Sequence, residues 1–232
     1  MTSTGWLPSP SPSLSSRPST RSAPPTSTPK LDRTPDRPVP FIGLTGGIGA
    51  GKSTALEALE RAGAAVLSTD RVVHELYSST EVIDAVRERF GDAVAPGGVV
   101  DRGALAKRAF ATPEDRAWLE GLLWPLVGER MVAWRSAVSE AAEPPHAAVV
   151  EVPLLFESGM EGAFDATIAV VAGEDVRAAR AGARGHEALA ERSARQLSQQ
   201  EKAHRATYVV VNDGTVQDLE SKLSALLEML HT

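Results

Sequence analysis

The chain has 232 residues, 42% of them hydrophobic, which suffices for one α/β domain with an insertion. It contains no cysteine, so disulfides, thiolate metal sites and cysteine nucleophiles are excluded. No apolar run approaches the ~20 residues of a membrane span, and the net charge of −6 argues against broad nucleic-acid affinity. These features favour a cytoplasmic protein without nucleic-acid or membrane partners.

The first 40 residues differ from the rest in composition. They hold 10 of the 16 prolines and 15 Ser or Thr, and they carry a charge of +3, which leaves −9 on the remainder. Such a segment buries too little apolar area to offset its chain entropy, so we expect residues 1–38 to be a disordered tail and residues 39–232 to fold. An organelle transit peptide and a start codon placed too early are the alternatives.

Residues 46–53 follow the P-loop pattern G-x-x-x-x-G-K-[ST]. Glycines leave room for a phosphate against main-chain N–H groups, the lysine brings a mobile positive charge to it, and the following hydroxyl can bind Mg²⁺. An apolar run at 39–45 and an amphipathic stretch at 52–62 supply the required order of strand, loop and helix, which disfavours an incidental glycine-rich turn. The residues expected to hold nucleotide phosphates are Gly46, Gly47, Gly49, Ala50, Gly51, Lys52, Ser53 and Thr54.

A second strand is predicted at residues 64–68, followed by Thr69-Asp70 and a helix that begins near residue 71. Ligands of open α/β sheets bind beyond the carboxyl ends of the strands. We therefore expect Asp70 to face the P-loop phosphates. The alternative is that Asp70 is the N-cap of the helix, and the two roles can coexist.

The stretch from residue 80 to residue 143 is predicted to be mostly helical. Helices are expected at residues 81–90, after the capping residue Asp101, and at residues 113–142 with an interruption at Pro125. This is more than a simple crossover between strands needs. We expect an inserted region, at about residues 80–145, that binds the acceptor substrate.

The remaining strands are predicted at residues 146–152, 165–172 and 207–212, before an amphipathic helix at residues 215–230. Glu151 lies at the carboxyl end of the first of these, an arrangement that positions Mg²⁺ in P-loop enzymes. Strands and helices alternate along the chain. The pattern predicts a doubly wound, five-stranded parallel sheet with helices on both faces.

Basic residues are concentrated between residues 174 and 205. The seven are Arg177, Arg180, Arg184, Arg192, Arg195, Lys202 and Arg205. A basic run is most often a solvated helix face, but here the rest of the folded part is acidic. We expect a lid, at about residues 180–205, that closes over the phosphates and stabilises the charge of the transferring group.

Taken together, these stretches resemble the dephospho-CoA kinase family from about Phe41 to the C-terminus. The P-loop in the form Leu-Thr-Gly-Gly-Ile-Gly and the later motif Val-Pro-Leu-Leu-Phe-Glu are specific as a pair. The residues that carry the resemblance are Ile42 to Thr54, Thr69-Asp70, His74-Glu75-Leu76, Asp101-Arg102, Leu105 to Phe110, Pro125-Leu126-Val127, Val152 to Glu157, Gln196, Lys202 and Asn212-Asp-Gly214.

The resemblance implies a P-loop kinase that uses ATP and Mg²⁺ to phosphorylate the ribose 3′-hydroxyl of dephospho-CoA, the last step of CoA synthesis. Asp70 matches the aspartate thought to accept the hydroxyl proton, and Lys52 and Arg184 would complete the catalytic set. Arg180 and Arg184 match lid arginines that bind the nucleotide. Metal contacts would come from Ser53 and Glu151, and acceptor contacts from Asp70, His74, Pro153, Leu154, Leu155 and Phe156. Small molecules would be the only partners of a monomer, with an oligomer left open.

The sequence departs from the family pattern at a few positions. Glu151 stands where Asp is usual, Trp124 stands where His is common, and the lid is about three residues shorter between Arg184 and Gln196. Two other functions are kept as alternatives: a P-loop kinase for a nucleoside or small alcohol, and a nucleotide-dependent switch. A guanine-reading Asn-Lys-x-Asp motif, expected of a GTPase switch, is not present.

Overall fold

The computed structural model describes residues 38–182 and 196–231. The tail expected at residues 1–38 therefore lies outside the described residues, apart from Pro38. Positions 183–195 of the expected lid also lie outside them.

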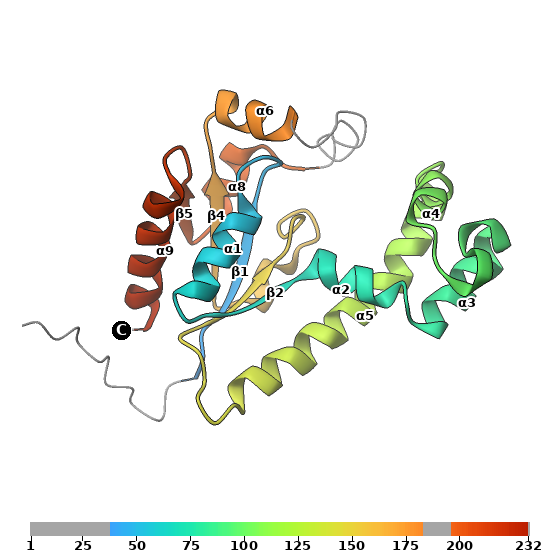
Figure 1. Ribbon diagram of the computed structural model, residues 1–232, viewed down its shortest axis with the longest axis horizontal. Helices are drawn as coiled ribbons and strands as arrows, with labels where there is room; N and C mark the ends of the chain where they lie inside the picture. Colours follow the sequence, from blue (N-terminus) through green and yellow to red (C-terminus); the bar gives the residue numbers. More distant parts are fainter. Residues whose placement is uncertain (1–37, 183–195, 232) are drawn as a thin grey trace, which may run out of the picture. The chain divides into compact units, whose positions relative to one another are not determined.

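The described residues contain one sheet of five strands, and every neighbouring pair is parallel. The strands are β1 Phe41–Gly46, β2 Ala65–Ser68, β3 Ala148–Glu151, β4 Ala166–Val171 and β5 Tyr208–Val211, in the order β2-β3-β1-β4-β5. Leu44 and Ser68 both lie opposite Glu151, so the carboxyl ends of β1, β2 and β3 meet at one edge (Figure 1). The predicted five-stranded parallel α/β fold is confirmed.

The helices alternate with these strands and lie close to their expected positions. They are α1 Lys52–Arg61, α2 Thr69–Leu76, α3 Thr80–Phe90, α4 Arg102–Ala109, α5 Pro113–Ser139, α6 Glu174–Gly182, α8 Gln199–Arg205 and α9 Val216–His231, with short 3₁₀ helices η1 Asp92–Val94, η2 Pro96–Gly98 and η3 Met160–Ala163. Asp101 caps α4 as predicted, since its Oδ1 accepts from two backbone N–H groups at 2.9 and 3.0 Å. None of the described helices is both long and apolar enough to cross a membrane.

Alternating side chains of the strands feed two separate hydrophobic cores. Ile42 and Leu44 of β1 point into a core shared with α1 and α9, which lie together on one face of the sheet (Figure 1). Phe41 of β1 and Val150 of β3 instead belong to the core that packs against α2, α3, α4 and α5. Helices therefore cover both faces, and the inserted helices are anchored to the sheet by the second core.

Helix α5 continues through Pro125, so the predicted interruption is wrong. A proline inside a helix removes one N–H and crowds the carbonyl four residues earlier, which here belongs to Gly121. Four side chains one turn apart remain buried on both sides of the proline: Leu119, Leu123, Val127 and Met131. Their burial outweighs the local cost.

We predict that Val127→Ala lowers the free energy of unfolding by about 1.5 to 3 kcal/mol, because it removes two buried methyl groups and leaves a cavity. Val132→Ala on the same helix is the matched control, since Val132 is 68% exposed, and it should change stability by less than about 0.5 kcal/mol. Urea unfolding measures both. Equal effects of the two variants would contradict the assignment of the α5 core face.

Candidate active site

Two glycines of the P-loop have backbone conformations and neighbours that exclude other residues. Gly51 is the N-cap residue of α1 at φ 94°, and a Cβ there would lie 2.2 Å from Nδ2 of Asn212. Gly49 has φ 76°, and its Cβ would lie 2.7 Å from the carbonyl oxygen of Arg177. Side chains at either position would both strain the backbone and push these neighbours away.

The P-loop carbonyls are held from outside the loop. Arg177 of α6 donates from Nε to the oxygen of Ile48 at 2.9 Å, and Asn212, which follows β5, donates from Nδ2 to the oxygen of Ala50 at 2.9 Å. A trans peptide points its N–H away from its C=O, so the N–H groups of Gly49 and Gly51 point away from these donors. The loop is thereby arranged as an anion cradle.

The beginning of α1 extends this cradle. The helix has no side-chain N-cap hydrogen bond and no acidic residue in its first turn, so no carboxylate competes with an anion for its positive dipole end. Lys52 folds back over the loop, where Nζ donates to the oxygens of Gly46 at 3.1 Å and Gly47 at 3.3 Å. Ser53 and its hydroxyl are exposed next to it.

Glu151 is an acidic residue buried at the shared edge of the sheet. It is 7% exposed, and its Oε2 accepts from Oγ of Ser68 at 3.0 Å. Burial raises the pKa of the Glu151 carboxyl; the positive charge of Lys52 and the Ser68 hydrogen bond oppose this rise, and the negative charge of Asp70 adds to it. Lys52 and Asp70 thus each lie within electrostatic reach of Glu151.

Asp70 lies in the first turn of α2 and is exposed. The helix begins at Thr69, earlier than predicted, and its N-cap residue is Ser68, so the alternative that Asp70 is the N-cap is wrong. The reason is a tertiary contact: Oγ1 of Thr69 donates to the backbone oxygen of Glu151 at 3.0 Å, which ties the start of the helix to the neighbouring strand.

The predicted acceptor residues divide into two groups. His74 is exposed on α2, one turn after Asp70, and its Nδ1 lies 3.4 Å from Nη1 of Arg102 at the start of α4. Pro153 and Leu154 are half-buried after β3, whereas Leu155 and Phe156 are core residues with 0% and 3% exposure. The expectation that all these side chains line a site does not hold for Leu155 and Phe156, because core packing covers both.

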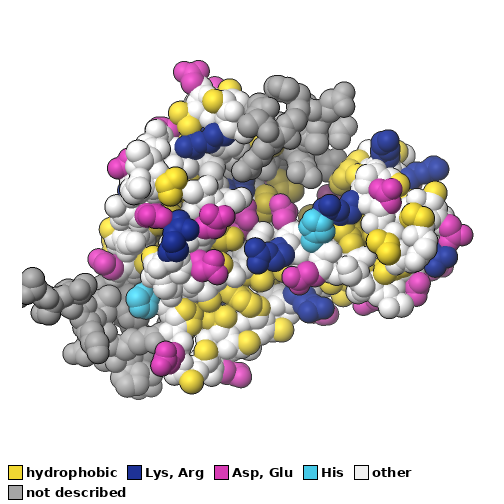
Figure 2. Space-filling view, viewed as in Figure 1, with side chains coloured by type: hydrophobic (Ala, Val, Ile, Leu, Met, Phe, Trp, Pro, Cys, Tyr) yellow, Lys and Arg dark blue, Asp and Glu magenta, His cyan; other side chains and the backbone are white. Residues whose placement is uncertain are grey.

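The described residues of the basic stretch differ in their surroundings. Arg180 lies beside the P-loop, with Nη1 donating to the oxygen of Asn212 at 3.1 Å, but Arg184 lies outside the described residues. Lys202 is buried against Glu157, and Arg205 pairs with Glu161. Both had been counted among the lid cations, but each is engaged with a glutamate. On the face that Figure 2 shows, acidic and basic side chains are interspersed.

Sequence reasoning gave no role to three residues that shape the site. Arg177 and Asn212 hold the P-loop carbonyls, and Gln199 of α8 bonds both the N–H and the oxygen of Ala172 at 3.0 and 2.9 Å. Asn212 lies in the Asn212-Asp-Gly214 motif that the chain shares with the family, and this motif could have marked it as a site residue. Nothing in the sequence distinguishes Arg177 from the other six basic residues between residues 174 and 205.

The donor set at this edge fits Mg²⁺. Mg²⁺ prefers oxygen ligands and usually keeps waters and substrate phosphates in its shell instead of an all-protein cage. Within residues 38–182 and 196–231 no group of three His, Cys, Asp or Glu could hold a metal alone. The hydroxyl of Ser53 and the buried carboxyl of Glu151 are suited to share an ion with nucleotide phosphates.

We predict that Glu151→Gln stabilises the ligand-free protein increasingly as pH rises. A raised pKa in the folded state means that the acid contributes stability below its unfolded pKa, near 4.5, and loses that contribution as pH rises through the folded value. Glutamine does not titrate, so the difference in free energy of unfolding between variant and wild type should grow from acid to neutral pH. Urea unfolding at several pH values measures it; a constant difference would contradict the raised pKa.

Comparisons with known proteins agree with this geometry. The family model described as dephospho-CoA kinase matches residues 40–218. A dephospho-CoA kinase of Deinococcus radiodurans is 41% identical over 192 residues, covering 82% of this chain and 91% of the relative. One of Chlorobaculum tepidum is 36% identical over 200 residues, covering 83% and 95%.

Solved structures share the fold. A crystal structure from Thermus thermophilus superposes with a TM-score of 0.69 at 34% identity, covering 84% of this chain and 99% of that one. The dephospho-CoA kinase of Campylobacter jejuni has the same fold, with a TM-score of 0.62 at 20% identity over 82% of this chain and 96% of that one. The chain belongs to the dephospho-CoA kinase family.

Proposed function

We propose that this protein transfers the γ-phosphoryl group of ATP to the ribose 3′-hydroxyl of dephospho-CoA and so produces CoA. The observation that carries the proposal is the convergence of an anion cradle, Lys52, Glu151 and Asp70 at one edge of the sheet in a member of this family. Phosphoryl transfer needs positioning and charge stabilisation more than covalent help from the protein, and this edge supplies both.

The nucleotide side of the reaction is assigned to the P-loop. The N–H groups of Gly49 and of residues 51–54 would surround the phosphates, with contributions from Gly46 and Gly47 at the loop entrance; the N–H of Ala50 donates to the oxygen of Gly47 at 3.2 Å and closes the loop. Lys52 would leave the loop carbonyls and neutralise charge on the β- and γ-phosphates. Arg180 would lie at the same phosphates, and Arg184, outside the described residues, is kept as a proposed lid arginine.

The metal contacts are assigned to Ser53 and Glu151. Mg²⁺, when bound with ATP, would neutralise phosphate charge and fix the orientation of the γ-phosphoryl group. Glu151 must be ionised to serve, and the nearby ammonium of Lys52 favours that form. The side chain of Glu is one methylene longer than that of the usual Asp, which would change the balance between direct and water-mediated contacts with the ion.

The acceptor side is assigned to Asp70, His74 and the segment that follows β3. Asp70 would accept the proton of the attacking 3′-hydroxyl, while His74 lies one turn later on α2 with Arg102 of α4 beside it. Pro153 and Leu154 would contact the acceptor, with Leu155 and Phe156 supporting them from the core. The inserted helices at about residues 80–145 would complete this side.

A coupled assay tests the proposal. Purified protein, ATP and Mg²⁺ are combined with dephospho-CoA or with a panel of nucleosides and small alcohols, and ADP release and CoA are measured. We expect turnover of dephospho-CoA with a large preference over the panel, and loss of turnover in excess chelator. A folded protein that phosphorylates other acceptors but not dephospho-CoA would overturn the specificity.

The same preparation addresses the remaining proposals. We propose a monomer in the cytoplasm that acts on small molecules alone, with a lid within residues 180–205 and a tail at 1–38 outside the kinase domain of residues 39–232. Light scattering during size-exclusion chromatography gives the oligomeric state. A stable dimer at micromolar concentration would refute the monomer.

We predict that Lys52→Ala lowers kcat/KM by an amount equivalent to about 3 to 4 kcal/mol, because a positive charge at the transferring phosphoryl group is lost. Arg61→Ala at the exposed end of the same helix is the control, and it should retain wild-type kinetics. Steady-state assays with both variants compare them. A Lys52→Ala enzyme of near wild-type activity would exclude this role.

We predict that Asp70→Asn lowers kcat strongly while the affinity for ATP changes little, because the proton acceptor acts on the alcohol and not on the nucleotide. Nucleotide affinity is measured by calorimetry with a non-hydrolysable ATP analogue, and kcat by the coupled assay. Comparable losses in both quantities would indicate that Asp70 is structural.

A further inference from the structure

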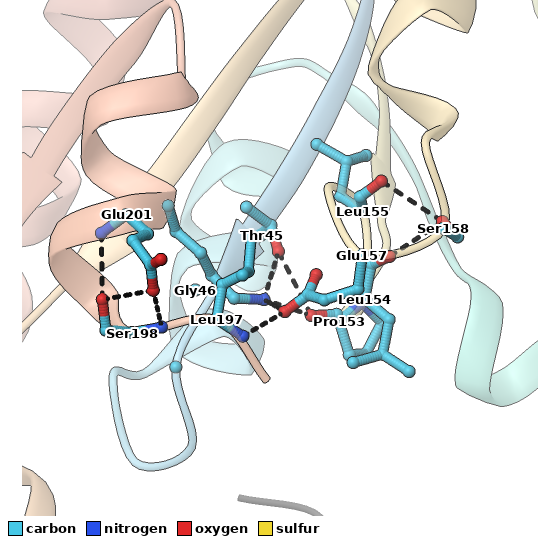
Figure 3. A network of polar contacts seen from close by, with 12 residues as sticks. Thr45, Gly46, Pro153, Leu154, Leu155, Glu157, Ser158, Leu197, Ser198 and Glu201 are labelled. Carbon is cyan, nitrogen blue, oxygen red and sulfur yellow. Dashed lines mark hydrogen bonds and ion pairs between the residues drawn. The ribbon is translucent and has the colours of Figure 1, made fainter. Parts of the chain in front are cut away.

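Lys202 of α8 is the largest fully buried side chain among the described residues. Its Nζ donates to the backbone oxygen of Pro153 at 2.6 Å and to Oγ1 of Thr45 at 3.4 Å, and it forms an ion pair with Oε1 of Glu157 at 2.9 Å. Figure 3 shows the labelled partners gathered around this point. Because its exposure is 0%, the ammonium does not reach a ligand in the cradle.

The contacts of Lys202 join three segments that are far apart in the sequence. Thr45 is the residue of β1 directly before Gly46, where the P-loop begins, while Pro153 and Glu157 follow β3. Oγ1 of Thr45 also donates to Pro153 at 3.3 Å, and Oε1 of Glu157 accepts from the N–H of Leu197, just before α8, at 2.8 Å. One buried cation therefore fixes the segment after β3 against the strand that carries the P-loop.

Stability alone is a poor reason for this arrangement. Removing two charges from water costs several kcal/mol per ion, and apolar replacements of buried pairs are often neutral or stabilising. Burial lowers the pKa of the Lys202 ammonium, and Glu157 only opposes that effect. Among the described residues, none forms a hydrogen bond with the buried Oε2 of Glu157. Burying the Lys202–Glu157 pair therefore costs folding free energy. What the pair provides is a fixed geometry of the segments that it joins.

We propose that Lys202 is a positioning residue for phosphoryl transfer: it sets the place of the Pro153–Phe156 segment relative to Gly46, and thereby the place of the acceptor relative to the γ-phosphate. The inference rests on the proposed function, because it assumes that this segment supports the acceptor. Misplacement by about 1 Å can cost a factor of 100 in rate, so a small shift of Pro153 would be visible in kinetics.

The structure also indicates for which substrate the kinetics should change when Lys202 is replaced. Arg177 and Asn212 hold the P-loop independently of Lys202, so the nucleotide site keeps its supports. The oxygen of Pro153 would keep one donor, Thr45. Loss of Lys202 should therefore act on the acceptor and much less on ATP.

The deciding variant is the double substitution Lys202→Met with Glu157→Gln, which removes both charges but keeps side-chain volume and an acceptor for the N–H of Leu197. We expect kcat/KM for dephospho-CoA to fall by about 10- to 100-fold, KM for ATP to stay within about twofold, and the urea midpoint to stay near the wild-type value. The control Arg61→Met with Glu220→Gln removes an exposed ion pair between α1 and α9 and should leave all three values unchanged.

A second variant keeps the test decisive if the double variant does not fold. Thr45→Val is nearly isosteric and removes the hydroxyl that bonds both Pro153 and Lys202. It should raise KM for dephospho-CoA and so lower kcat/KM, by less than the double variant does. A folded double variant with wild-type acceptor kinetics, or with equal losses for both substrates, would overturn the inference. If the double variant does not fold, Thr45→Val decides alone, and kinetics for dephospho-CoA that match the wild type would then overturn the inference. Failure of the wild type to phosphorylate dephospho-CoA would instead contradict the proposed function.

Discussion

The site depends on two hydrogen bonds that hold the P-loop from behind. Arg177 and Asn212 engage the carbonyls of Ile48 and Ala50, and the planar trans peptide then turns the next N–H groups toward the side where phosphates are proposed to bind. Both donors come from segments that follow β4 and β5, more than 120 residues after the loop. The segments after the last two strands of the chain, β4 and β5, are thus needed to shape the P-loop, which follows the first strand.

The parallel sheet supplies the second constraint. Because β3 lies between β1 and β2, the strand order puts Glu151 directly beside the P-loop strand and brings Ser68 and Asp70 to the same edge. Burying the carboxyl of Glu151 is unfavourable, as its raised pKa indicates. Lys52 offsets part of this cost. The arrangement sacrifices some stability to keep opposite charges close where phosphates and a metal ion are proposed to bind.

The sequence alone was sufficient for features that depend on local pattern. Strand–loop–helix order around Lys52, the alternation of strands and helices, and the cap at Asp101 all follow from neighbours a few residues apart. The positions of Asp70 and Glu151 at the carboxyl ends of predicted strands indicated both as site residues, and the family resemblance then implied their roles.

Features set by tertiary packing could not be obtained in this way. Pro125 breaks isolated helices, but four buried side chains carry α5 through it. Leu155 and Phe156 belong to the family motif Val152 to Glu157, for which acceptor contacts were predicted, yet core packing covers both side chains. Lys202 was counted among the cations of the expected lid. Its partners are distant in the chain: Glu157 precedes it by 45 residues and Thr45 by 157. Local periodicity carries no information about such contacts.

The most direct test of this account is a crystal structure with a non-hydrolysable ATP analogue, Mg²⁺ and dephospho-CoA bound. The account predicts phosphates on the N–H groups of Gly49 and Gly51, the ammonium of Lys52 at the γ-phosphate, and the ribose 3′-hydroxyl between that phosphate and the carboxylate of Asp70. A complex in which Asp70 points away from the terminal phosphate, with no space for an alcohol between them, would contradict it.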